Sequence, residues 1–248
     1  ALEHMEDIGN MFSRFSEIAS KNPYSWFKIH RSVEEIVETT PQNRMVSFPY
    51  TKYMNSIIRV NQSAALVITS AKKAKELGIP TSKWIFMHGA GCINDIWNIT
   101  ERENLYSSPA IRKCAEAIFS KAGCTQSDVS FYDLYSCFPS AVQIAKKEIG
   151  IPEKDLRDLT VTGGLPYYGG PGSAYVVNSL ASMVNKLREN QGSYGLVNAN
   201  GWFLTKHGLG IFSSNPFLGE WNQVVDSSLL QKEIENLEHP EFIEEANG

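Results

Sequence analysis

The sequence lacks a long apolar run. No stretch approaches the roughly 18 consecutive apolar residues of a membrane-spanning helix, and the start of the chain lacks a signal-peptide pattern. Cysteine is scarce: Cys92, Cys114, Cys124 and Cys137 form no C-x-x-C pair, and none has a histidine at zinc-ligand spacing. These absences predict a cytoplasmic protein with reduced thiols, no membrane span and no metal site.

An excess of basic charge is also missing. The net charge is −4, which argues against a nucleic-acid-binding protein. The usual catalytic signatures are absent as well: there is no G-x-S-x-G, no G-x-x-x-x-G-K-[ST], no H-E-x-x-H and no G-x-G-x-x-G after a strand. Ordinary α/β-hydrolases, nucleotide phosphate loops and helical zinc proteases are therefore excluded.

The 248 residues contain enough apolar side chains for a large core, at 42% hydrophobic and 11% aromatic. Apolar spacing predicts a helix over 8–18, followed by an irregular covering segment up to residue 60. Further on, helices and strands alternate. The expected strands cover 64–69, 83–87, 129–134, 194–198 and 202–205, and the helices cover 70–78, 109–122, 139–150 and 173–190. This alternation predicts an α/β fold that ends in an antiparallel hairpin.

Local signals sharpen several of these elements. Residues 64–69 form a continuous apolar run, which is typical of a buried strand. Residues 88–92 (His-Gly-Ala-Gly-Cys) indicate a turn, and Asn200-Gly201 is a pair favoured at the centre of a hairpin turn. The helix over 173–190 is expected to bury one apolar face, made of Val176, Val177, Leu180, Val184 and Leu187.

We expect three regions. Residues 1–60 comprise a start that resembles a cloning remnant (1–5), a helix and the covering segment; residues 61–226 form the α/β domain; and residues 227–248 form a short helix and an acidic tail. Three loops at predicted strand ends are left as candidates for a site, since α/β folds bind ligands there. They are 133–139 (Asp-Leu-Tyr-Ser-Cys-Phe-Pro), the glycine-rich 162–172 and 198–208 (Asn-Ala-Asn-Gly-Trp-Phe-Leu-Thr-Lys-His-Gly).

The order and spacing of these loops resemble the C-terminal half of the thiolase superfamily, in particular the sterol-carrier-protein type and its thiolase-like acetyl-CoA acetyltransferase relatives. Residues 62–70 followed by 75–78 are similar to the superfamily segment D-G-A-A-A and its helix. The resemblance covers roughly residues 50–215. It implies a layered α/β fold of which this chain is the C-terminal half, with a mixed sheet flanked by helices. It also implies acyl transfer with a coenzyme A thioester as substrate and no further cofactor.

At the positions of the superfamily's catalytic residues, the sequence departs from the superfamily pattern. Tyr135 replaces the histidine of H-D-C-F, and Ser136 replaces the aspartate, whereas Cys137 and Phe138 match. Gly170 replaces the histidine of the G-H-P loop, and Ala199 lies near the place of the second cysteine. The half that carries the nucleophilic cysteine is not in this sequence. Standard thiolysis by this chain alone is therefore not expected.

The candidate catalytic residues are Tyr135, Cys137 and His207, and the candidate residues for binding substrate or coenzyme A are Gly169, Gly170 and Asn200. Each has a structural alternative. Tyr135 is either a donor to a thioester carbonyl or a packed aromatic, Cys137 a nucleophile or a small buried residue, and His207 an acid/base or a structural histidine. The two glycines either approach a ligand or satisfy the backbone. If the superfamily geometry holds, Tyr135, Gly170 and Asn200 line one cleft.

Two functions remain open: a thiolase-like acyl-CoA acyltransferase fragment that is inactive alone, and a non-catalytic module or subunit that binds acyl-CoA or lipid. The missing half predicts that the helix over 173–190 exposes an apolar face. That face consists of Ala174, Val177, Leu180, Ala181 and Val184. We therefore expect a homo-oligomer or a complementary chain that supplies the N-terminal half. The alternative is that residues 6–60 cover this face in a stable monomer.

Overall fold

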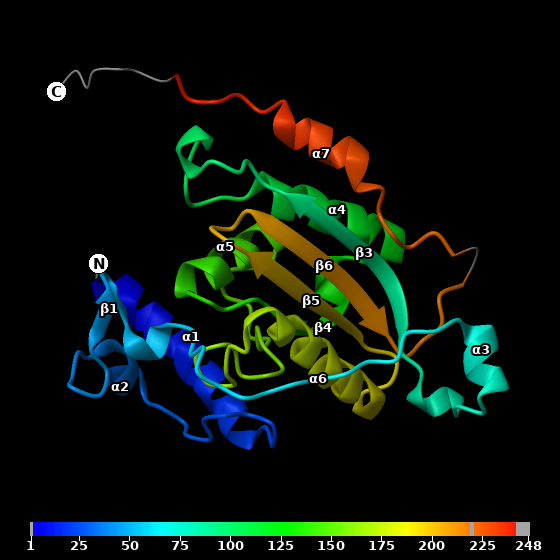
Figure 1. The fold of residues 1–248 in the computed structure, drawn as a ribbon, viewed down its shortest axis with the longest axis horizontal. Helices are drawn as coiled ribbons and strands as arrows, with labels where there is room; N and C mark the ends of the chain where they lie inside the picture. Colours follow the sequence, from blue (N-terminus) through cyan, green and yellow to red (C-terminus); the bar gives the residue numbers. More distant parts are fainter. Residues whose placement is uncertain (1, 219–220, 242–248) are drawn as a thin grey trace.

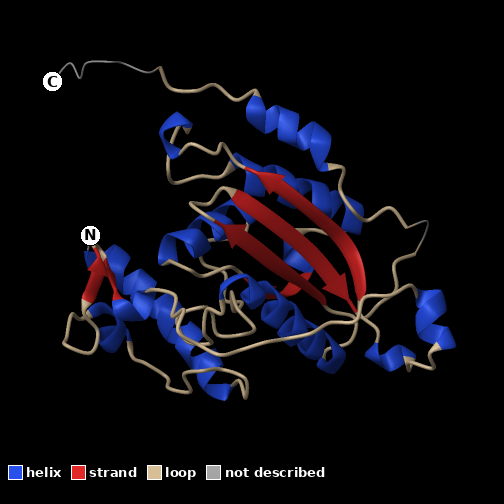
Figure 2. Cartoon of the chain, viewed as in Figure 1, coloured by secondary structure: helices blue, strands red, loops and turns tan. Residues whose placement is uncertain are grey.

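The computed structural model describes residues 2–218 and 221–241, and a mixed four-stranded sheet lies at its centre (Figures 1 and 2). The strands are β3 (Phe86–Asn94), β4 (Val129–Asp133), β5 (Tyr194–Gly201) and β6 (Lys206–Ser213). Their order is β3-β6-β5-β4; β4 and β5 are parallel, and the other neighbours are antiparallel. The predicted α/β class with a mixed sheet flanked by helices is confirmed.

Helices cover both faces of this sheet. The α-helices are α1 (Leu2–Lys21), α2 (Val33–Val37), α3 (Ala71–Glu76), α4 (Pro109–Ala122), α5 (Pro139–Ile149), α6 (Tyr175–Glu189) and α7 (Ser227–Glu235). Short 3₁₀ turns occupy Lys52–Met54, Thr81–Lys83, Ile99–Glu101, Gln126–Asp128 and Gly172–Ala174, and β1 (Met45–Ser47) pairs with β2 (Tyr50–Thr51). Leu196 packs in the core with α4 and α5, whereas Val197 packs with α6. Because neighbouring side chains on a strand point to opposite faces, α6 covers the face opposite α4 and α5.

Several local signals are confirmed. The Ser108 hydroxyl accepts a hydrogen bond from the Ile111 amide at the start of α4, Pro109 is its first residue, and Gly123 ends it with φ +64°. The Ser70 hydroxyl caps α3 in the same way. The predicted N-terminal helix is longer than expected, since α1 already begins at Leu2 and includes most of the stretch 1–5 that resembles a cloning remnant.

The N-terminal segment belongs to the main core. Phe12 and Phe15 of α1 are buried and stack with ring centroids 5.4 Å apart. A Cβ on Gly164 would lie 2.6 Å from the Phe15 ring, and Gly163 faces Ala19. The glycine-rich loop therefore packs beneath α1, and the main core runs from Ile8 to Ile234.

The predicted strand at 64–69 is wrong. These residues form neither a helix nor a strand, and Val67 and Ile68 are 84% and 93% exposed. The reason is that no neighbouring strand pairs with them in the described chain.

The expected turn at 88–92 and strand at 83–87 are also corrected. Residues 88–92 lie inside β3, which starts only at Phe86. The two glycines allow the close approach of α4: a Cβ on Gly89 would lie 2.5 Å from the Ile118 carbonyl oxygen, and one on Gly91 would lie 2.9 Å from the Cys114 sulfur. Here glycine indicates helix–sheet packing rather than a turn.

The hairpin is confirmed, but its turn lies further along the chain. Asn200 and Gly201 end β5, so residues 202–205 form the turn instead of the expected strand. Trp202 and Leu204 adopt φ of +57° and +54°, which is uncommon outside glycine. Arg102 stabilises this turn through hydrogen bonds to the Phe203 carbonyl (2.8 Å) and the Thr205 hydroxyl (3.1 Å).

The buried face of α6 differs from the expected one. Its buried residues are Tyr175, Asn178, Ser179, Met183 and Leu187. The apolar face that we expected to be exposed is half-buried instead. It consists of Ala174, Val177, Leu180, Ala181 and Val184. The chain between β2 and α3 crosses in front of α6 in Figure 1.

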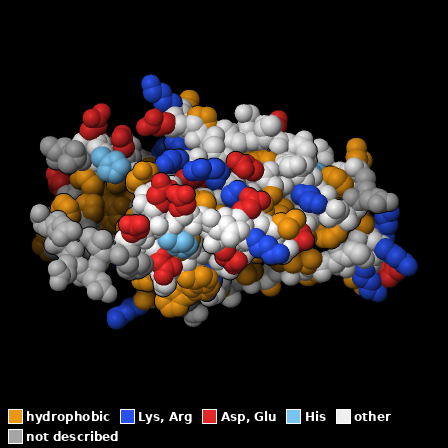
Figure 3. Space-filling model, turned by 90° about the horizontal axis from the view of Figure 1, so that it is seen from above, with side chains coloured by type: hydrophobic (Ala, Val, Ile, Leu, Met, Phe, Trp, Pro, Cys, Tyr) orange, Lys and Arg blue, Asp and Glu red, His pale blue; other side chains and the backbone are white. Residues whose placement is uncertain are grey.

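The view from above shows acidic and basic side chains mixed with hydrophobic ones (Figure 3). This mixture on the visible face agrees with the small net charge. The acidic tail predicted at the end of the chain includes residues 242–248, which lie outside the described residues. Within the described part, no helix has the length and apolar character needed to cross a bilayer.

Candidate functional site

The first and third candidate loops meet at one edge of the sheet. They follow β4 and β5, which are parallel, so both leave the sheet at the same edge. The Tyr135 amide donates a hydrogen bond to Asn198 Oδ1 (3.3 Å), and Asn200 Nδ2 donates to Cys137 Sγ (3.8 Å). Tyr135 and Cys137 are thereby brought to the end of β5 that carries Asn200.

The second loop is held in place by the buried carboxylate of Asp133. It accepts hydrogen bonds from the Val161 and Thr162 amides and from the Tyr175 hydroxyl, each at 3.0 Å. Burial raises the pKa of Asp133, and the two amides act in the opposite direction. The Ser136 hydroxyl adds a link by accepting a hydrogen bond from the Leu165 amide (3.0 Å). The glycine-rich loop is therefore fixed to the end of β4.

Gly169 and Gly170 are both buried against residues 56–62. A Cβ on Gly169 would collide with the Gln62 side chain, and one on Gly170 would collide with the Ser56 hydroxyl. Gly169 also has a backbone φ of +120°, which residues other than glycine rarely adopt. The protein's own chain thus makes the kind of close approach that one of the two alternatives assigned to a ligand. Of the two readings, the structure supports backbone packing for these glycines.

The side chains of Cys137 and Asn200 are linked by a hydrogen bond, and Tyr135 joins them through its backbone amide, which donates to Asn198. Burial raises the pKa of the Cys137 thiol, so it stays protonated at neutral pH and is a poor nucleophile. Burial likewise raises the pKa of Tyr135, whose ring meets Tyr175 edge-on at 5.5 Å. The Asn200 Oδ1 is buried and has no hydrogen-bond partner among the described residues. Amide and phenol donors of this kind suit a carbonyl oxygen.

His207 lies opposite Asn200 on the neighbouring strand, but its ring makes its hydrogen-bond contacts with other residues. Its Nε2 is 3.1 Å from the Leu204 carbonyl oxygen and 3.4 Å from the Ser108 hydroxyl, which donates to Asp95 Oδ2 at 2.6 Å. Burial lowers the pKa of His207 to about 4, against the opposing effect of the Asp95 charge. The imidazole is therefore neutral and is turned toward the start of α4. These contacts support the structural alternative for His207.

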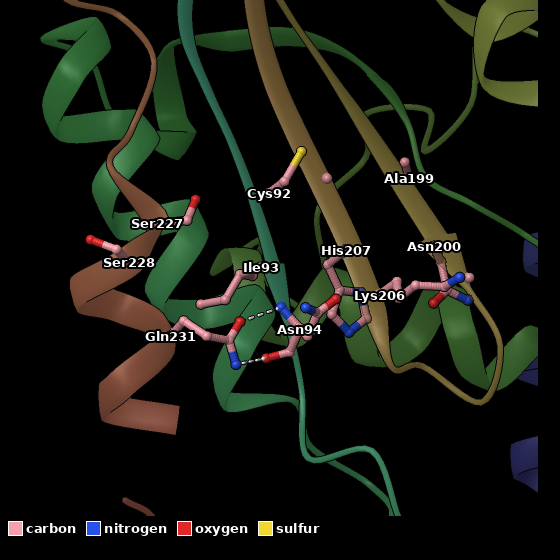
Figure 4. A pocket seen from close by; sticks show the side chains of 12 residues that line it. Cys92, Ile93, Asn94, Ala199, Asn200, Lys206, His207, Ser227, Ser228 and Gln231 are labelled. Atoms are coloured by element: carbon pink, nitrogen blue, oxygen red, sulfur yellow. Dashed lines mark hydrogen bonds between the residues drawn. The ribbon is translucent and has the colours of Figure 1, made fainter. Parts of the chain in front are cut away.

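A cavity of about 610 Å³ opens beside the end of the hairpin (Figure 4). Its walls come from β3, β5, β6 and α7, and they include Cys92, Ala199, Asn200, His207 and Gln231. Tyr135, Cys137 and Gly170 do not line it. The expected single cleft of Tyr135, Gly170 and Asn200 is thus not this cavity. Asn200 connects the cavity with the loop cluster, because it lines the cavity and also donates a hydrogen bond to Cys137.

Three residues of the loop cluster were missed in the sequence. Ser56 donates its amide hydrogen to the Cys137 carbonyl (3.1 Å), and Gln62 donates to the Tyr168 carbonyl (2.9 Å). Ser56 sits in no motif, and Gln62 only begins the segment that is similar to D-G-A-A-A; the path of the chain across the loop brings both residues there. Asn198 had a signal, because it is a buried polar residue at a strand end in the third loop. No group of three metal-ligating side chains occurs in residues 2–218 and 221–241.

The fold is that of thiolases. No protein-family model matches the chain. Among solved structures, a monomeric SCP2-thiolase-like protein type 1 from Mycobacterium smegmatis matches with a TM-score of 0.88 and 34% identity, over 99% of this chain and 53% of that protein. Sterol carrier protein 2 of Rattus norvegicus is 25% identical over 198 residues, which is 74% of this chain and 34% of the relative.

The benzoylsuccinyl-CoA thiolase subunit BbsB of Thauera aromatica is 26% identical over 204 residues, covering 76% of this chain and 51% of the relative. The chain thus spans about a third to a half of the curated relatives that it matches. It belongs to the thiolase superfamily and is similar to the members of the sterol-carrier-protein type.

Proposed function

We propose that this chain is the acyl-thioester-binding half of a thiolase-like acyltransferase. The observation that carries the proposal is the meeting of Tyr135, Cys137 and Asn200 where β4 and β5 end, within a thiolase fold. The Asn200 amide and the Tyr135 hydroxyl would donate hydrogen bonds to the thioester carbonyl. Such donors stabilise the negative charge that develops on that oxygen during acyl transfer.

Turnover in this proposal needs groups that the chain does not supply. The Cys137 thiol is protonated, and His207 is neutral and turned away. A nucleophilic thiolate and its base would come from a complementary N-terminal half or from an oligomer that includes one. The relative from Thauera aromatica is named a thiolase subunit, which supports a role within an assembly.

A second candidate is a non-catalytic module that binds acyl-CoA or lipid. It is favoured by the resemblance to the superfamily, in which Gly170 takes the place of the histidine and Ala199 lies near the place of the second cysteine. It is also favoured by the cavity beside Asn200, which is open to solvent and has room for a small ligand. The two candidates share the binding step and differ only in whether a partner completes the chemistry.

Calorimetric titration with acetyl-CoA, run beside an acetoacetyl-CoA thiolysis assay, tests both candidates. We expect saturable binding and no turnover by the chain alone. Asn200→Ala removes a donor and is expected to weaken binding about fivefold, since one hydrogen bond contributes about 1 kcal/mol. Asn185→Ala, at an exposed position on α6, is the matched control and leaves binding unchanged. Absence of binding would refute the proposal, and turnover by the isolated chain would remove the need for a partner.

A further inference from the structure

The end of the molecule at which α3 lies is basic. Residues 70–86, which include α3 and the 3₁₀ turn Thr81–Lys83, hold four lysines and a single glutamate. This stretch carries a net charge of +3 in a chain whose net charge is −4, so the other residues together carry −7. At this end Figure 3 shows a cluster of Lys and Arg side chains. Such an asymmetry of charge indicates an anionic partner.

Most of these cations are free to meet a partner. Lys72, Lys75 and Lys83 are exposed, and none of them forms an ion pair with another described residue. The one glutamate, Glu76, is 3.2 Å from Lys73 and offsets only that charge. The ammonium groups are therefore held in water, where they cost little to present and can exchange solvent for an anion.

This basic surface lies away from the loop cluster that carries Tyr135 and Asn200. Arg188 joins α6 to the surface by donating two hydrogen bonds to the Lys83 carbonyl (3.0 and 2.7 Å). Along the axis of α6, Arg188 is roughly 20 Å from Tyr175, at about 1.5 Å per residue. In Figure 1, α3 and the turn between β5 and β6 lie at opposite ends of the molecule.

Exposed apolar side chains accompany the cations. Leu77 directly follows α3 and is 60% exposed. The segment between β6 and α7 starts at the same end of the molecule (Figure 1), and its Leu218 and Trp221 are 88% and 64% exposed. Lysine combined with exposed leucine and tryptophan is typical of surfaces that lie on a bilayer, where ammonium groups meet anionic headgroups and indole rings enter the interface. Nucleic acid also offers phosphates, but it offers no apolar phase for leucine.

We propose that this end is a docking surface for an anionic lipid bilayer, and that it goes beyond the proposed function. Its residues are Lys72, Lys73, Lys75, Lys83 and Arg188 together with Leu77, Leu218 and Trp221. The cations bind headgroup phosphates and carboxylates, and the apolar side chains enter the interface. Docking in this way leaves the loop cluster, at the other end, in water, where a coenzyme A thioester is dissolved.

Vesicle co-sedimentation tests the proposal. The probe is vesicles of phosphatidylcholine with about 30% phosphatidylserine, and vesicles of pure phosphatidylcholine are the reference. At about 0.1 M salt we expect saturable binding to the anionic vesicles and at least tenfold weaker binding to the reference. Binding should be lost at about 1 M salt, where the Debye length falls to about 3 Å.

A pair of charge variants locates the binding surface. Lys72→Glu with Lys75→Glu is expected to weaken vesicle binding at least tenfold, since each basic residue close to an anionic membrane contributes severalfold. Lys28→Glu with Lys154→Glu is the matched control, because it changes the net charge equally at exposed positions elsewhere. It should leave binding within about twofold of the parent. All four positions are exposed, so an unchanged thermal unfolding temperature verifies that each variant folds.

A second pair of variants tests the apolar contribution. Trp221→Ala is expected to weaken vesicle binding about fivefold, because its indole no longer enters the interface. Trp97→Ala is the control: its indole is similarly exposed, at 59%, but lies beside Lys206 at the start of β6. It should leave vesicle binding unchanged.

Several results would overturn the docking surface. They are no binding to anionic vesicles, equal binding to both kinds of vesicle, and equal loss in a variant and its control. Tighter binding of duplex DNA or of polyglutamate than of vesicles at the same salt would assign the surface to another class of partner. Weaker acetyl-CoA binding by the Lys72 and Lys75 variant would assign these cations to coenzyme A instead. The proposed function is tested separately, since acetyl-CoA titration uses no vesicles and either result can fail while the other holds.

Discussion

Gly89 provides a sharp test of how the sheet and α4 pack. A Cβ added at this position would lie 2.5 Å from the Ile118 carbonyl oxygen and 3.2 Å from its carbon. Both atoms belong to the backbone in the middle of a helix, so they cannot move aside as a side-chain tip would. Gly89→Ala must therefore separate α4 from β3 or distort one of them. Overpacking of this kind typically costs about 1–3 kcal/mol.

Gly208→Ala is the matched control on the neighbouring strand. Its added Cβ would meet Ala199 and Cys92 at 3.6 Å, which is ordinary van der Waals contact. Urea unfolding followed by circular dichroism measures both variants. We expect Gly89→Ala to lower the free energy of unfolding by about 2–3 kcal/mol, a fall in Tm of about 4–12 °C for a chain of this size. Gly208→Ala should stay within about 0.5 kcal/mol of the parent. Equal stability of the two variants would refute the close approach of α4.

Three further predictions concern the site and its support. Because burial lowers the pKa of His207 to about 4, below the usual value of 6.5, its neutral form stabilises the fold above pH 6.5. That contribution, about 3 kcal/mol, is lost as the pH falls toward 4. In His207→Gln the free energy of unfolding should therefore depend less on pH between 6.5 and 4. Arg102→Lys cannot reproduce the fork of hydrogen bonds that holds the turn after β5, and should cost about 1–2 kcal/mol with faster amide exchange in 201–206. At neutral pH the exposed Cys92 should react with a thiol reagent at least tenfold faster than Cys137, whose pKa is raised; equal rates, read by peptide mass spectrometry, would contradict the neutral thiol.

Local chemistry explains which elements were predictable. Ser108, Pro109 and Gly123 mark the ends of α4 because capping depends only on residues near in sequence. The three candidate loops were found in the same way, at the ends of apolar runs. The meeting of the first and third loops was also predictable, since neighbouring parallel strands end at the same edge.

The errors arise where distant parts of the chain decide the local structure. Gly89 looked like a turn residue because nothing nearby in the sequence reveals that α4 packs against it. The turn after β5 moved beyond Gly201 because Arg102, about a hundred residues earlier, stabilises the unusual backbone of Trp202 and Leu204. Ser56 was overlooked for the same reason, since its contact with Cys137 depends on the path of the covering segment.

The protonation states of the site favour binding over independent catalysis. Acyl transfer through a cysteine requires a thiolate, and a thiolate requires a nearby base or positive charge that lowers the thiol pKa. Cys137 has the opposite surroundings: burial raises its pKa, and its polar neighbour is the uncharged amide of Asn200. The one histidine of the loops, His207, faces Ser108 instead. These groups suit holding and polarising a thioester carbonyl, so our proposal draws the nucleophile and its base from outside these loops.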